Sequence, residues 1–64
     1  MNQLPKGLQQ IYVMADKCCK ILMMKGITAK SAEETVLNAL KEYDLDLKAG
    51  NYKKVETALE IKFA

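Results

Sequence analysis

Residues 22–43, LMMKGITAKSAEETVLNALKEY, contain one glycine-marked break between two stretches with helical periodicity. Gly26 follows Lys25 and suits the position just after a helix end, where the backbone turns left-handed. Ser31 followed by Glu34 has the form of a capping box, in which the two side chains accept hydrogen bonds from backbone N–H groups. The stretch therefore predicts two helices joined by a short connection.

The same spacing of apolar residues continues on both sides of this stretch. It predicts helices over residues 5–25, 32–48 and 51–62, with Pro5 in the first turn and Gly50 at the second break. Short connections make consecutive helices antiparallel neighbours. We therefore expect an all-α protein, a small three-helix bundle that forms a single helical domain over residues 1–64.

One segment permits a different prediction. Residues 43–48, YDLDLK, alternate as a strand would, and LEIKF at residues 59–63 would be the pairing strand. Leu47 also falls on the apolar stripe of the second helix, so we favour the helical interpretation.

Residues 39–61, ALKEYDLDLKAGNYKKVETALEI, resemble the helix-turn-helix hairpin of a tetratricopeptide repeat. The resemblance rests on AGNY at the turn and on Ala58 and Leu59 downstream, and it covers about a third of the chain. Val55 departs from the pattern, which prefers alanine there, and an isolated repeat cannot bury its own faces. The resemblance implies a helical hairpin and nothing about function.

Composition favours a small protein in a reducing compartment. A chain of 64 residues has room for one core. Its two cysteines, Cys18 and Cys19, are neighbours, and a disulfide between them would close no loop. Residues 1–7 lack the pattern of a secretory signal, and the apolar runs are too short to cross a bilayer. We expect a cytoplasmic protein that binds no membrane.

The residue types argue against catalysis and against metal binding. Histidine is absent, so the commonest general base and the commonest nitrogen ligand for zinc are missing. Ser31 is expected to be a helix cap, and two adjacent cysteines do not complete a four-ligand metal site. Val55 stands where a calcium loop beginning at Asp44 would need its glutamate. We predict no enzyme, no catalytic residue, no metal, no cofactor and no small-molecule substrate.

The first predicted helix carries more apolar surface than one packing face needs. Its apolar arc covers over half the circumference, whereas the other two helices each have a single narrow stripe. Exposed methionine-rich surface suits association. The alternative is that this helix is central and most of the arc is core. We predict a protein interface, through which the chain forms a homodimer or binds another protein, at Val13, Met14, Ile21 and Met24.

Charge is unevenly distributed along the chain. The net charge is +2, but residues 31–50 are acid-rich and residues 1–30 are lysine-rich. A cluster of acids would suit a basic partner protein. The predicted acidic partner face consists of Glu33, Glu34, Glu42, Asp44 and Asp46.

DNA binding is the alternative function. Residues 22–43 also have the rhythm of a DNA-binding helix-turn-helix, and the lysines that would contact nucleic acid are Lys17, Lys20, Lys25 and Lys30. Against it, the second helix of that motif would begin with acids, and arginine is absent. The sequence favours a small non-catalytic regulatory or adaptor protein that acts by protein–protein binding, with a helix-turn-helix-like transcriptional regulator as the alternative.

Overall fold

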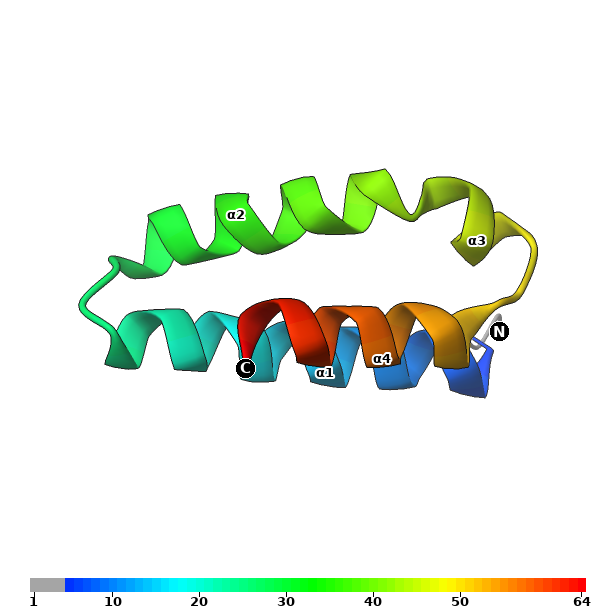
Figure 1. Ribbon diagram of the computed structural model, residues 1–64, viewed down its shortest axis with the longest axis horizontal. Helices are drawn as coiled ribbons and strands as arrows, with labels where there is room; N and C mark the ends of the chain where they lie inside the picture. The colour runs from blue at the N-terminus through cyan, green and yellow to red at the C-terminus, as the bar shows by residue number, and fades with distance from the viewer. Residues whose placement is uncertain (1–4) are drawn as a thin grey trace, which may run out of the picture.

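The computed structural model describes residues 5–64 and shows these as a helical bundle (Figure 1). The helices are α1 (Lys6–Met24), α2 (Ala29–Glu42), α3 (Asp44–Lys48) and α4 (Tyr52–Phe63). The helix α1 runs antiparallel to α2, and the chain then returns along α1 through α4, with the short α3 in the connection. The all-α bundle is confirmed, and the strand alternative for residues 43–48 is wrong, because Tyr43 lies in a turn and α3 occupies residues 44–48.

Both predicted glycine breaks are real helix ends with the same hydrogen-bond pattern. Gly26 has φ +97°, and its N–H donates to the carbonyl of Met23 at 3.0 Å. The N–H of Ile27 donates to the carbonyl of Leu22 at 3.1 Å, which completes a Schellman motif. Gly50, with φ +80°, ends α3 with the equivalent pair of bonds. Glycine is suited to both positions because it has no Cβ to oppose a positive φ.

The start of α2 differs from the prediction. The helix begins at Ala29, three residues early, and Thr28 is its N-cap, with Oγ1 accepting from the N–H of Ser31 at 3.3 Å. The capping box at Ser31 and Glu34 is therefore wrong, because the hydroxyl of Thr28 already satisfies an orphan N–H one turn earlier. Ser31 instead lies inside the first turn, where its carbonyl accepts from Thr35 Oγ1 at 2.8 Å.

The predicted second helix is interrupted at Tyr43. This residue has φ −105° and ψ +19°, and its N–H donates to the carbonyl of Leu40 at 3.0 Å, a tight last turn for α2. The chain resumes helix at Asp44. Tyr43 and Leu47 are both half-buried against the core, so the interruption still leaves α3 packed on the bundle.

The core draws on three helices equally. The helix α1 packs against both α2 and α4, so it is the central element. Cys18 lies in the middle of this core, where its Sγ is 3.8 Å from the carbonyl oxygen of Leu59. The buried core residues are Ile11, Cys18 and Leu22 of α1, Ala32, Val36 and Ala39 of α2, and Val55, Leu59 and Phe63 of α4.

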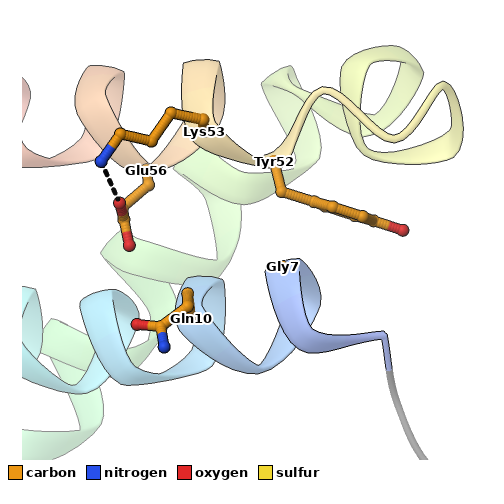
Figure 2. Close-up of a pocket in the computed structure, with 5 residues that line it drawn as sticks. All are labelled: Gly7, Gln10, Tyr52, Lys53 and Glu56. Atoms are coloured by element: carbon orange, nitrogen blue, oxygen red, sulfur yellow. Dashed lines mark hydrogen bonds and ion pairs between the residues drawn. The ribbon is translucent and has the colours of Figure 1, made fainter.

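The first turns of α1 and α4 approach closely (Figure 2). The ring of Tyr52 lies over Gly7, where an added Cβ would stand 2.8 Å from the Cβ of Tyr52. A small pocket of about 290 Å³ lies beside this contact, and Gln10 also lines it. On the α4 side of the pocket, Lys53 and Glu56 form an ion pair at 3.3 Å. Only glycine at position 7 permits this separation of the two helices without a shift.

Ion pairs connect α4 to the α2–α3 segment. Lys62 of α4 pairs with Glu42 at 3.3 Å, and Lys54 pairs with Asp46 at 3.4 Å. The side chains of both pairs are partly exposed, and such pairs contribute little stability, typically about 0–1 kcal/mol each. They link α4 to the α2–α3 segment at the surface, while burial of apolar side chains holds the core together.

Candidate protein-binding groove

A groove lined mainly by apolar side chains lies between α1 and α2. It has a volume of about 310 Å³. Buried Val36 and half-buried Cys19 lie at its base. The lining residues of each helix recur at three- and four-residue steps, so they form one row on α1 and one row on α2. The lining residues are Tyr12, Ala15, Asp16 and Cys19 of α1 and Glu33, Val36, Leu37 and Leu40 of α2.

Two large apolar side chains stand exposed on opposite walls of this groove. Tyr12 of α1 is 55% exposed, and Leu37 of α2 is 56% exposed. Met23, which is also exposed, continues the row of Tyr12 and Cys19 by one further turn of α1. The groove is therefore mainly apolar, with one carboxylate from each helix, Asp16 and Glu33, and the monomer leaves Tyr12 and Leu37 in contact with water.

The thiols near the groove are poor nucleophiles. Burial raises the pKa of the Cys18 thiol, and the neighbouring Cys19 and Glu60 raise it further. Burial also raises the pKa of Cys19, with added contributions from the carboxylates of Glu33 and Asp16. Both thiols are free and stay protonated near neutral pH. The described residues contain no cluster of three or more side chains able to hold a metal ion.

The structure divides the predicted helix-one interface. Val13 is 55% exposed and Met24 is 87% exposed. Met14 is half-buried and packs against the core, and Ile21 is half-buried. These four residues do not form one open surface, because the central position of α1 draws Met14 inward.

The apolar periodicity of the sequence does not identify Leu37 as a surface residue of interest. It lies beside the predicted core stripe of α2, next to Val36, and the stripe alone gave no reason to select it. Tyr12 belongs to the apolar arc of the first helix, and the arc by itself does not predict that this side chain faces an open groove. The one sequence feature that could have identified Leu37 is that it is a large apolar residue one position away from the core stripe.

The predicted acidic residues do not share one face. Glu42 and Asp46 pair with lysines of α4, and Asp44 pairs with Lys48 within α3 at 3.0 Å. Glu33 instead lines the α1–α2 groove, and Glu34 is exposed on α2. Three of the five carboxylates thus contribute to contacts within the monomer.

The lysines of the DNA alternative are also scattered. Lys20 pairs with Asp16 at 3.0 Å, Lys25 is the C-cap of α1, and Lys30 lies in the first turn of α2. Lys17 is exposed on α1. In Figure 1, α1 and α2 run alongside each other, whereas the helices of a helix-turn-helix cross at about 90–120°. DNA binding stays an untested prediction with no support from this geometry.

Comparison of the chain with protein-family models, with curated protein sequences and with solved structures finds no match. Within residues 5–64, none of the helices has the length and apolar character needed to span a membrane. The interpretation of the groove therefore depends on its own residues.

Proposed function

We propose that this chain is a non-catalytic protein-binding module with a regulatory or adaptor role, and that the α1–α2 groove binds an amphipathic helix of a protein partner. The observation that carries the proposal is the exposure of Tyr12 and Leu37 on opposite walls of an apolar groove. Two neighbouring antiparallel helices make a straight groove, which suits a third helix that places apolar residues at three- and four-residue steps.

Burial of the groove walls would supply much of the binding free energy. Burying a fully exposed leucine side chain completely is worth about 1.5–3 kcal/mol, and covering the exposed part of Leu37 would supply a share of that free energy. Tyr12 has the additional advantage that tyrosine loses little conformational entropy and often anchors protein interfaces. A partner that covers both Tyr12 and Leu37 therefore gains from two anchors in one site.

Other features support a binding role in a reducing compartment. The two thiols are protonated and free, and histidine is absent, so the groove has no activated nucleophile or usual general base. Free cysteines are typical of the cytoplasm, which is the location that we propose.

The test compares capture of partners by three forms of the immobilised protein. Wild type, Leu37→Glu and Met24→Glu are exposed to a lysate of cells that express a differently tagged copy, and retained proteins are quantified by mass spectrometry. Leu37→Glu places a charge in the groove, while Met24→Glu places the same charge on an exposed site of α1 outside it. Circular dichroism confirms that the variants keep their helicity.

We expect at least one protein, the tagged copy included, to be retained by wild type and by Met24→Glu and lost with Leu37→Glu. Equal retention by all three forms would show that the groove does not bind proteins. Loss with Met24→Glu alone would transfer the function to the exposed side of α1 that the sequence indicated.

A further inference from the structure

The groove is bordered by charges that the monomer does not pair. Among residues 5–64, no ion pair involves Glu33 or Lys41, although Glu42, the residue after Lys41, is paired with Lys62 of α4. Glu33 precedes Leu37 by four residues, and Lys41 follows Leu37 by four. Residues four apart on an α-helix are neighbours on one face, about 6 Å apart along the axis. The three residues thus form one exposed row on α2.

This row has opposite charges at equal distances from its apolar centre. A two-fold axis through Leu37 would bring α2 against a second α2 in the antiparallel direction. Glu33 of each copy would then face Lys41 of the other copy, which makes two such pairs. The two Leu37 side chains would meet between these pairs. An in-register parallel arrangement would instead place Glu33 against Glu33 and Lys41 against Lys41. The charge pattern therefore selects the antiparallel arrangement of identical chains.

The α1 wall of the groove is compatible with the same axis. Tyr12 and Cys19 lie at equal distances from the midpoint between Ala15 and Asp16. Antiparallel packing of α1 on a second α1 about that midpoint would place Tyr12 over Cys19 of the other copy, which covers the exposed ring. Asp16 is already neutralised by Lys20 at 3.0 Å, so it adds no unpaired charge at the centre.

We propose that the partner that covers the groove is a second copy of this chain, with α2 packed on α2 about a two-fold axis at Leu37 and with Glu33 of each copy paired with Lys41 of the other. The inference rests on the proposed function, because it names the partner of that same groove. A standard interface covers about 800 Å² per partner. That is about one sixth of the 4805 Å² of accessible surface of the monomer.

Sedimentation equilibrium in reducing buffer at low salt tests the pairing. The samples are wild type, Leu37→Glu, Glu33→Lys, Lys41→Glu, the double variant Glu33→Lys with Lys41→Glu, and Met24→Glu as a control outside the groove. Each single reversal places like charges together twice, so we expect the dimer dissociation constant to rise about tenfold or more. The double variant exchanges the charges and should return to within about threefold of wild type, and Met24→Glu should not change it.

Alkylation of Cys19 gives a second measurement on the unmodified chain. The rate should fall as protein concentration passes the dissociation constant, because Tyr12 of the second copy covers the thiol, and it should not fall in this range for Glu33→Lys. Circular dichroism of every variant confirms that weakened association is not lost folding.

The possible outcomes separate this inference from the proposed function. A dimer that the charge reversals leave unchanged overturns the two-fold pairing, even if Leu37→Glu still abolishes partner capture. A wild-type chain that stays monomeric at all concentrations overturns the second copy as partner, while capture of another protein lost with Leu37→Glu leaves the groove function standing. A dimer that Met24→Glu dissociates and Leu37→Glu does not would overturn both.

Discussion

Cys19 shows how position within the fold determines the chemistry of a residue. Its neighbour Cys18 faces the core, whereas Cys19 lies half-buried at the groove near two carboxylates. Burial first, and the charges of Glu33 and Asp16 next, raise the pKa of the Cys19 thiol. Since the thiolate is the reactive form, the structure makes both cysteines slow to react.

The reactivity of Cys19 should depend on pH and on Glu33. A raised pKa means that less thiolate is present at a given pH, so alkylation at pH 8 should be slower than for an ordinary thiol and should increase as the pH rises toward the raised pKa. Glu33→Gln removes a negative charge, which lowers the pKa of Cys19 and speeds the reaction.

Iodoacetamide labelling of dilute protein, followed by peptide mass spectrometry, measures both sites. Buried Cys18 is the internal control, because its labelling requires opening of the core. An unchanged or slower rate at Cys19 in Glu33→Gln would contradict the electrostatic explanation.

The elements of this bundle begin and end where local groups satisfy the backbone. Gly26 and Gly50 end α1 and α3 through the same Schellman hydrogen bonds. At the start of α2, two hydroxyl residues compete for the cap, and Thr28 occupies it. The helix therefore includes the turn that contains Ser31.

Removing the two hydroxyls should have unequal effects on stability. Thr28→Ala removes the side-chain acceptor of the Ser31 N–H and should lower the free energy of unfolding by about 1 kcal/mol. Ser31→Ala should be neutral or slightly stabilising, by up to about 0.5 kcal/mol, because Ser31 lies inside the helix and alanine has the higher helix propensity.

Urea unfolding followed by circular dichroism measures both variants. The reverse order, with the larger loss for Ser31→Ala, would restore the capping box that the sequence predicted and would contradict Thr28 as the cap.

The whole molecule depends on apolar burial around a central α1. Each of α1, α2 and α4 contributes buried residues to one small core, while the ion pairs to α4 lie at the surface. A chain of 64 residues has a total stability of only about 3–10 kcal/mol. Loss of one core side chain is therefore a large fraction of the total.

Leu59→Ala and Glu42→Gln should differ strongly in stability. Leu59 is fully buried, so its truncation should cost about 2–5 kcal/mol and unfold a substantial part of the population. Glu42 pairs with Lys62, but these side chains are 64% and 45% exposed, so Glu42→Gln should cost less than about 1 kcal/mol. Thermal and urea unfolding measure both, and comparable losses would show that the ion pair and not the core fixes α4.

The sequence by itself determined the helical class, the two glycine ends and the approximate extent of α1 and α4. These depend on local periodicity and on backbone conformation, which neighbouring residues control. It did not determine which hydroxyl caps α2, because Thr28 and Ser31 both carry a suitable group. The break at Tyr43 was also missed, since Leu47 continues the apolar stripe across it.

Only the tertiary structure decided which apolar residues of α1 are used and which remain exposed. Met14 packs against the core, Tyr12 is exposed on the wall of the groove, and Met24 is exposed outside the groove. A helical wheel lists all three as apolar, but burial is a property of helix pairs and depends on how α2 and α4 sit around α1. Leu37 became a candidate anchor for the same reason, because the groove beside it exists only when two helices meet.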